Sequence, residues 1–221
     1  MDVEEAIRGR RSIRKFRPDP VPEELLREIL DVARWSPSWR NTQAWTVWAV
    51  GGDPLRQFKA QFSEKLLGGA PSQPDVDMPG REFPDACMDR TRRLMDERGA
   101  CELAAGMDCS PEATSARIGD LFGAPCLLVF AIDDCLPPTY ACFDNGVLVQ
   151  TVCLEAHAKG LGTCIMATAV RYPEVLPAVL PNAEGKHMVV CIALGYPDTT
   201  AAVNSFARER AELDELVTFV G

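Results

Sequence analysis

Histidine and lysine are scarce in this sequence of 221 residues: there are two histidines, and only five lysines stand beside 18 arginines. His157 and His187 are too few for a histidine-built metal site and give little support to a hydrolase triad. No apolar run reaches the roughly 18 residues of a membrane-spanning helix. The N-terminal residues are acidic, unlike the basic and then apolar start of a signal peptide. We therefore expect a cytoplasmic protein with no metal site.

Nine cysteines are many for this length, yet none forms a C-x-x-C pair. The shortest gaps, 101 to 109 and 135 to 142, match no common zinc or iron–sulfur spacing. Most of the nine lie in apolar stretches, where a reduced cysteine acts as a small core residue. We expect free, buried thiols rather than metal ligands. The nine are Cys87, Cys101, Cys109, Cys126, Cys135, Cys142, Cys153, Cys164 and Cys191.

Several nucleotide-binding and hydrolase motifs are also missing. The sequence has no G-x-x-x-x-G-K-[ST] and no G-x-S-x-G, which argues against a P-loop and a nucleophile elbow. Gly160-Leu161-Gly162 starts like a dinucleotide-binding fingerprint, but Ile165 stands where the third glycine belongs. The net charge of −9 argues against the broad basic face of a general nucleic-acid binder. Neither a Rossmann NAD site nor such a binder is expected.

The spacing of apolar and capping residues predicts a mixture of helices and strands. One helix opens at Pro22 and ends before Ser36, and Asp53 and Ser110 each resemble an N-cap before a first helical proline. The helix over 139–159 is apolar almost all round, so we expect it in a core or an interface. Further helices are predicted over 2–9, 53–67, 85–106, 110–123 and 173–180, and strands over 45–50, 125–132, 163–167 and 188–194.

Basic residues concentrate near the N-terminus, where six of the 23 fall in ten positions with no acidic residue among them. Such a focus in an acidic protein suggests a local anion, and the hydroxyl of Ser12 adds a donor. A solvated basic loop or an arm that contacts nucleic acid remains an open alternative. The six residues are Arg8, Arg10, Arg11, Arg14, Lys15 and Arg17.

Two further segments carry polar or flexible residues at element boundaries. The loop 36–43 holds hydroxyl and amide groups that can bind the polar edge of a ligand, although a capped helix end and a turn explain it as well. Gly160 and Gly162 suit a helix C-cap that leads into a strand. Residues 68–84 contain seven glycines and prolines, so we expect a long, ordered excursion there.

Taken in order, these segments resemble the FMN-dependent nitroreductase family. The segment 10–16 (RRSIRKF) is similar to the opening signature of that family, and residues 36–45 are similar to its second motif. Residues 160–163 and 193–197 resemble the third and fourth motifs, and Arg208 with Arg210 resembles the closing basic pair. Region 60–120 matches weakly. No single motif is decisive, but five in the same order are specific.

The resemblance implies an α+β, three-layer fold in which helices flank a central mixed or antiparallel sheet. It also implies an intertwined homodimer with FMN at the subunit interface. The chain would be a single nitroreductase-like domain over 1–221, with a lid-like excursion at about 68–106 and a C-terminal arm at about 206–221.

The same resemblance implies the residues that bind the flavin. The FMN phosphate and ribityl chain would lie against Arg10, Arg11, Ser12 and Arg14, joined by Arg208 and Arg210. The other subunit, or the flavin edge, would involve Pro37, Ser38, Trp39, Asn41 and Gln43. The isoalloxazine would lie along Ile165, Met166, Ala167 and Thr168. Trp39, Ala44 and the pair 167–168 depart from the usual family residues, which puts substrate shape and flavin tuning in doubt.

The implied function is an FMN-dependent oxidoreductase that uses NAD(P)H to reduce nitroaromatics, quinones or related acceptors by a ping-pong mechanism. The redox chemistry would reside on the cofactor, so no catalytic side chain is assigned. Reductive dehalogenation, flavin destruction and a non-catalytic flavin-binding role are the alternatives. The excursion carries four arginines that suit an anionic acceptor or the phosphates of the nicotinamide cofactor: Arg81, Arg90, Arg92 and Arg93.

Overall fold

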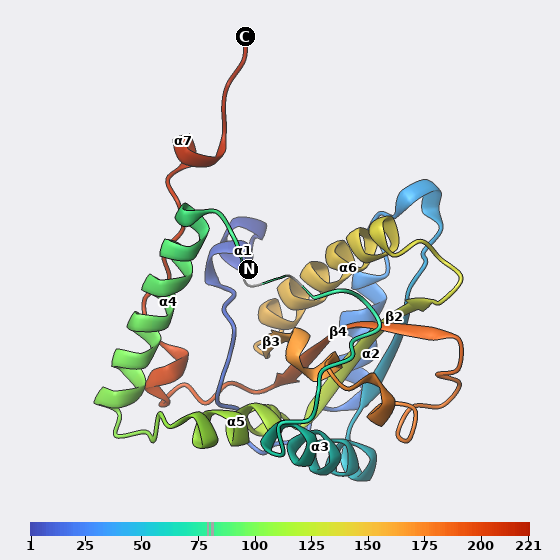
Figure 1. The fold of residues 1–221 in the computed structure, drawn as a ribbon. Helices are drawn as coiled ribbons and strands as arrows, with labels where there is room; N and C mark the ends of the chain where they lie inside the picture. The colour runs from blue at the N-terminus through green and yellow to red at the C-terminus, as the bar shows by residue number, and fades with distance from the viewer. Residues whose placement is uncertain (79, 81) are drawn as a thin grey trace.

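A four-stranded sheet forms the centre of the computed structural model, which describes residues 1–78, 80 and 82–221. The strands are β1 (Thr46–Val50), β2 (Cys126–Asp133), β3 (Gly162–Met166) and β4 (Lys186–Gly195), in the order β1-β2-β4-β3 (Figure 1). All three pairings are antiparallel. The expected central sheet is confirmed, in its antiparallel form.

The strand β2 shows how the sheet is covered on both faces. Side chains alternate along a strand, so the odd and even positions of β2 point to opposite sides. Leu127 and Val129 join a core with Phe58 and Phe62 of α3 (Gly52–Leu67). Leu128 and Phe130 join the other core.

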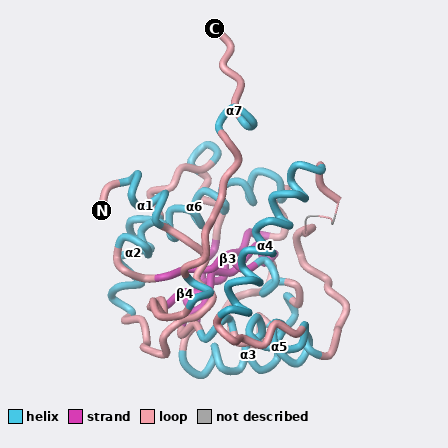
Figure 2. The backbone as a smooth tube through the Cα atoms, turned by 90° about the vertical axis from the view of Figure 1, so that its left-hand side faces the viewer, coloured by secondary structure: helices cyan, strands magenta, loops and turns pink. Residues whose placement is uncertain are grey.

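That second core is closed by α2 (Glu23–Ala33) and α6 (Pro138–Ala158), and α1 (Val3–Gly9) packs on α6. On the opposite side, α5 (Pro111–Gly119) packs against α3. Figure 2 shows the strands between α1, α2 and α6 on one side and α3 and α5 on the other. The α+β, three-layer architecture implied by the sequence is therefore confirmed.

The helix α6 ends in a Schellman motif that starts β3. Gly160 has φ +80° and its N–H bonds to the carbonyl of His157, while the N–H of Leu161 bonds to that of Ala156 at 2.8 Å. The expected C-cap is confirmed. Because glycine adopts this left-handed conformation without steric cost, the chain turns at once from the helix into β3.

Within one chain, α6 is less completely buried than its composition suggests. Its inner face, which includes Leu148 and Val152, lies in the core. Its outer face carries Tyr140 and Phe143, which are 65% and 67% exposed. The predicted burial in a core is therefore confirmed for one face of the helix, and the aromatic face at Tyr140 and Phe143 stays exposed in the protomer.

The excursion at 68–106 contains a segment, residues 70–75, that is held against the body and that we call the pinned segment, and a long helix, α4 (Asp85–Ala104). The pinned segment binds the body through three hydrogen bonds: Gln73 N–H to Arg171 O, Tyr172 O–H to Ala70 O, and Met188 N–H to an Asp75 carboxylate oxygen. The helix α4 lies beside the C-terminal arm, which carries α7 (Leu213–Leu216) and then projects from the body (Figures 1 and 2).

Two local predictions are wrong. Residues 173–180 form a single 3-10 turn, Pro173–Val175, and further turns, because Pro177 would remove a hydrogen bond from a helix interior and clash with the preceding turn. Asp53 does not cap α3; Gly51 is the N-cap and Asp53 lies in the first turn. Ser110, by contrast, accepts the N–H of Ala113 and caps α5 as predicted.

All nine cysteines are free thiols, as expected, but the expected burial is confirmed for only four of them; Cys135 is exposed, and Cys87, Cys101, Cys109 and Cys142 are half-buried. The four buried thiols are Cys126, Cys153, Cys164 and Cys191. Burial raises the pKa of Cys126 to about 12 and also raises those of Cys153 and Cys164, which keeps these thiols protonated and unreactive. Among the described residues, no helix is both long and apolar enough to cross a bilayer.

Candidate functional site

Three of the sequence motifs meet at the free edge of β3. Residues 10–17 run beside this strand, where Ser12 forms a parallel bridge with Thr163 and the N–H of Ile13 bonds to the Thr163 carbonyl at 2.9 Å. The segment then reaches the end of β4, where Phe16 pairs with Pro197. The first, third and fourth motifs are therefore brought together although some 180 residues of chain separate the outermost two.

Close backbone approach explains the glycines in these motifs. A Cβ added to Gly162 would lie 2.5 Å from Cγ1 of buried Ile13, and one added to Gly195 would lie 2.5 Å from Cδ of Pro125. Real Cβ atoms do not approach other atoms so closely. Glycine is thus required at 162 to admit the arginine-rich segment against β3.

Asn204 fixes this segment from the C-terminal side, and sequence reasoning missed it. Its side chain is buried at 7% exposure, and Oδ1 accepts the N–H of Arg14 at 2.7 Å. Its Nδ2 donates to the carbonyls of Lys15, at 2.7 Å, and Asp198, at 2.9 Å. One asparagine therefore joins the first motif, the residue that follows the fourth motif and the segment that leads into the arm. No local pattern marks it, because its partners in the first motif lie about 190 residues away.

Two of the predicted phosphate ligands hold the backbone together. Arg11 donates to the carbonyls of Asn204 and Phe206, and Arg208 donates to those of Arg8 and Arg10. These four bonds, which we call the strap, join residues 8–11 of the N-terminal segment to residues 204–208. Each guanidinium has five N–H donors, so both retain donors for an anion. Their assignment to the flavin phosphate stays a prediction.

Arg10 and Arg14 complete a positively charged cavity of about 100 Å³ at this strap. Among the described residues, none of the arginines that line it forms an ion pair with a carboxylate. Burial lowers the pKa of Arg14, and burial together with neighbouring arginines lowers that of Arg208. Partly buried cations without a counter-charge favour an anionic ligand. The cavity is lined by Arg10, Arg11, Ser12, Arg14, Leu94, Asn204, Phe206, Arg208 and Arg210.

His157, at the end of α6, borders a second cavity of about 240 Å³ together with Arg10 and Arg11. Partial burial lowers its pKa, as do the charges of Arg10 and Arg208. The imidazole is therefore neutral at pH 7, and it is a structural neighbour of the arginines rather than a further cation.

Beyond Thr163, β3 presents an apolar surface. Ile165 is 41% exposed and Ala167 is exposed, whereas Met166 is buried between them and Thr168 is half-buried. The alternation places Ile165 and Ala167 on the same open side. Ser12, which lines the arginine-lined cavity, pairs with Thr163, two residues before Ile165 on the same strand, and an exposed apolar surface suits a flat aromatic ring. The isoalloxazine contact implied for these residues stays a prediction.

The second motif forms a strained loop elsewhere on the molecule. Arg40, Asn41 and Gln43 all have φ between +47° and +59°, a left-handed conformation that costs non-glycine residues on the order of 1 kcal/mol each. The N–H of Trp39 bonds to the buried carboxylate of Asp144 at 3.1 Å. Backbone strain that a buried partner maintains marks a functional site more than a simple turn.

One chain does not unite this loop with the arginine cavity. Trp39 is held at Asp144 in the first third of α6, whereas Arg10 and Arg11 of that cavity lie with His157 around the second cavity, near the end of that helix. Asp144 and His157 are thirteen positions apart, which corresponds to roughly 20 Å of helix. The other loop residues implied for the flavin lie with Trp39: exposed Pro37, Asn41 and Gln43, and half-buried Ser38.

No group of three or more metal-ligating side chains occurs among residues 1–78, 80 and 82–221. Of the four arginines singled out in the excursion, Arg81 lies outside the described residues. Arg90 and Arg93 line a third cavity beside the arm, and Arg92 pairs with Asp89 on the surface of α4.

Comparison with known proteins agrees with this geometry. Residues 7–196 match the model of the nitroreductase family. The chain is 33% identical to a 4-nitrobenzoate reductase of Pseudomonas putida, with 100% of this chain and 96% of that protein covered. It is 30% identical to a chloronitrobenzene nitroreductase of Comamonas testosteroni, with 99% and 96% covered.

A solved structure extends the similarity to three dimensions. It is the FMN-dependent nitroreductase NfnB of Mycobacterium smegmatis in complex with NADPH, which superposes with a TM-score of 0.88 at 27% identity and with 99% and 97% of the two chains covered. Motifs, fold and both kinds of comparison agree across almost the whole sequence. The chain belongs to the nitroreductase family.

Proposed function

We propose that the protein is an FMN-dependent oxidoreductase that takes electrons from NAD(P)H and passes them to a nitroaromatic, a quinone or a related acceptor. The observation that carries this proposal is the cavity at Arg10 and Arg14, where partly buried guanidiniums have no carboxylate partner within the described part of the chain. Exposed Ile165 follows on β3 two residues after Thr163, the partner of Ser12 in that cavity. An anionic tail joined to a flat ring matches both parts.

The residues present fit FMN. Arg10, Arg14 and the spare donors of Arg11 and Arg208 would hold the phosphate by charge-assisted hydrogen bonds, and the hydroxyl of Ser12 adds a donor. Bound FMN would supply the hydride chemistry that links the nicotinamide cofactor to the acceptor in a ping-pong cycle.

The task of the chain is then to bind, orient and exclude water. Gly162 admits the arginine segment close to β3, and Asn204 fixes the backbone at Arg14. Ile165 and Ala167 would support one face of the ring, and the strained loop at Asn41 would bring amide groups to its edge.

We further propose a homodimer with the flavin between subunits. The loop at Trp39 and the cavity at Arg10 lie at different ends of α6, so a partner chain is needed to bring the two half-sites together. The uncovered aromatic face at Tyr140 and Phe143 supports an interface along the same helix.

Flavin identity and turnover test the enzymatic proposal. The purified protein should be yellow, release FMN rather than FAD on denaturation, and oxidise NAD(P)H when a nitroaromatic or menadione is added. Arg10→Ala should release most of the flavin at micromolar concentration. A colourless protein that neither takes up added FMN nor oxidises NAD(P)H would overturn the proposal.

The oligomeric state tests the interface. Phe143→Glu, which changes only an exposed side chain of the protomer, should produce a folded monomer by light scattering and a loss of FMN. Val32→Glu, an equivalent change on α2, is the matched control. A wild-type protein that is a flavin-loaded monomer would contradict the dimer.

The remaining expectations follow from this proposal. The chain would form one nitroreductase domain located in the cytoplasm, where its nine free thiols suit a reducing compartment. The lid-like role of the excursion would belong to α4, which contributes Leu94 to the arginine-lined cavity, whereas residues 70–75 are pinned to the body.

A further inference from the structure

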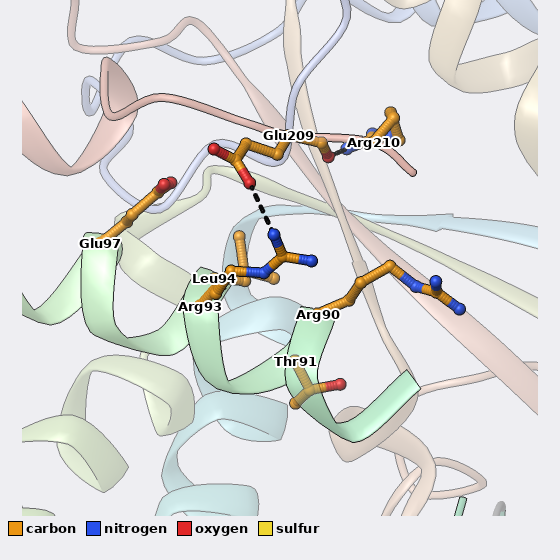
Figure 3. Close-up of a pocket in the computed structure, with 7 residues that line it drawn as sticks. All are labelled: Arg90, Thr91, Arg93, Leu94, Glu97, Glu209 and Arg210. Atoms are coloured by element: carbon orange, nitrogen blue, oxygen red, sulfur yellow. Dashed lines mark hydrogen bonds and ion pairs between the residues drawn. The ribbon is translucent and has the colours of Figure 1, made fainter. Parts of the chain in front are cut away.

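A cavity of about 230 Å³ lies between α4 and the C-terminal arm, apart from the residues assigned above to the flavin ring. Figure 3 shows Arg93 of α4 reaching toward Glu209 on the arm, with Arg90 one turn earlier on the helix and Arg210 beside Glu209. The cavity shares Leu94 and Arg210 with the smaller cavity of Arg10 and Arg14. The two cavities are therefore adjacent, and this one begins at the phosphate end of the flavin site.

The arginines of this cavity are only loosely neutralised. Arg93 lies 3.6 Å from the carboxylate of Glu209, and Arg90 lies 3.5 Å from that of Glu215, both beyond ordinary charge-assisted hydrogen-bond length. The carboxylates are more than half exposed, and such surface pairs contribute little stability. An incoming anion can therefore replace them at small cost.

The charges around the two adjacent cavities indicate how much negative charge they can bind together. The two cavities and their ion-pair partners contain seven arginines against three carboxylates, which leaves about four positive charges. The FMN phosphate carries roughly two negative charges, so about two positive charges remain. A second phosphate monoester would neutralise them. The arginines are Arg10, Arg11, Arg14, Arg90, Arg93, Arg208 and Arg210, and the carboxylates are Glu97, Glu209 and Glu215.

The cavity wall is anchored independently of these arginines. The thiol of Cys101 bonds to the carbonyl of Ala202 at 3.1 Å, and buried Glu102 lies 3.6 Å from both Arg98 and Arg117. These contacts fix the C-terminal end of α4 to the body. Substitutions two or three turns away should leave the helix in place.

We propose that Arg90 and Arg93, with Arg210, which lines both cavities and is shared with the flavin phosphate, bind the 2′-phosphate of NADPH and so make the enzyme selective for NADPH over NADH. This inference rests on the proposed function, because it takes the flavin phosphate to lie at Arg10 and Arg14. A dinucleotide with its nicotinamide on the flavin ring is long enough to reach past the flavin phosphate. A small aromatic acid whose nitro group lies on the ring is too short to place its carboxylate there.

Binding and turnover of the FMN-loaded protein test the proposal. By calorimetry, 2′,5′-ADP should bind the wild type at least tenfold more tightly than 5′-AMP. Arg90→Ala and Arg93→Ala should each reduce that preference by roughly tenfold, the size expected for one charge-assisted hydrogen bond. The kcat/KM for NADPH should fall in parallel, while that for NADH stays constant. Arg92→Ala, on the same helix but paired with Asp89 at 2.8 Å, is the matched control and should change neither quantity.

Each contrary result has a separate meaning. Equal binding of 2′,5′-ADP and 5′-AMP by the wild type would overturn the phosphate subsite. A loss of FMN from Arg93→Ala would overturn it too, because the cavity would then belong to the flavin. If Arg90→Ala or Arg93→Ala instead increases the KM for 4-nitrobenzoate and leaves the KM for NADPH unchanged, the cavity binds the acceptor and the proposal is overturned. If the wild type binds 2′,5′-ADP selectively but oxidises no NADPH, the subsite stands and the proposed function fails.

Discussion

Asn204→Ala tests whether one buried side chain holds the candidate site together. The substitution removes the acceptor for the N–H of Arg14 and the donors to the carbonyls of Lys15 and Asp198. A typical hydrogen bond contributes about 0.5–1.5 kcal/mol net, and a buried group left unpaired costs about 1–3 kcal/mol. Water can enter the space left by the side chain and recover part of this loss. We therefore expect the free energy of unfolding to fall by about 2–4 kcal/mol.

Urea unfolding and thermal melting at a fixed protein concentration measure this effect, because the proposed dimerisation would make both depend on concentration. For a chain of this size the expected loss corresponds to a fall in Tm of roughly 5–15 °C. FMN affinity should fall as well, since the backbone at Arg14 loses its anchor. Ser205→Ala is the control: its exposed hydroxyl bonds to the nearby carbonyl of Ala202, and we expect the free energy of unfolding to fall by less than about 0.5 kcal/mol. A loss below about 1 kcal/mol for Asn204→Ala would refute the reasoning.

Three further predictions follow from the same site. Arg10→Ala should weaken FMN binding by roughly 1.5–3 kcal/mol with little change in Tm. Arg11→Ala should lower both FMN affinity, measured by equilibrium titration, and Tm, measured by scanning calorimetry, because Arg11 also bonds to two backbone carbonyls. Gly162→Ala should lower the free energy of unfolding in urea by about 1–3 kcal/mol, since the new methyl group would clash with buried Ile13. An unchanged urea midpoint would mean that the segment at Ile13 can shift to accept the methyl group. The pKa of His157 is lowered in the folded state, so the unfolded state binds more protons just below its ordinary value of 6.5. Apoprotein stability should therefore fall as the pH decreases from about 6.5, and this component should be absent from His157→Gln in parallel unfolding titrations.

Local signals in the sequence predicted most elements of the fold. The Ser110 cap, the Gly160 C-cap and the strand at 126–133 depend on neighbours within a few residues, which the sequence displays directly. The false helix at 173–180 followed apolar spacing and underestimated Pro177 inside it. The cap assigned to Asp53 failed because the chain had already begun its helical turn one residue earlier.

The candidate site was predictable only in part. Arg10 and Arg14 were recognisable because like charges in an acidic chain suggest an anion. The role of Asn204 was not, because its partners in the first motif lie about 190 residues away and its neighbours show no periodic pattern. The sequence also does not reveal that Arg11 donates two hydrogen bonds to backbone carbonyls, or that α4 places Arg93 beside the arm. Such facts depend on which segments become neighbours in space.

The strap between the N-terminal segment and the arm has a consequence for biosynthesis. Its bonds join residues that are 193 to 200 positions apart, as in the pairs made by Arg11 with Asn204 and by Arg208 with Arg8. Contacts at such separation form after shorter loops have closed. The ribosome adds Asn204 and Arg208 only after the residues of all four strands have been synthesised. A chain truncated before residue 204 would therefore contain all four strands but lack Asn204 and Arg208, which complete the arginine-lined cavity.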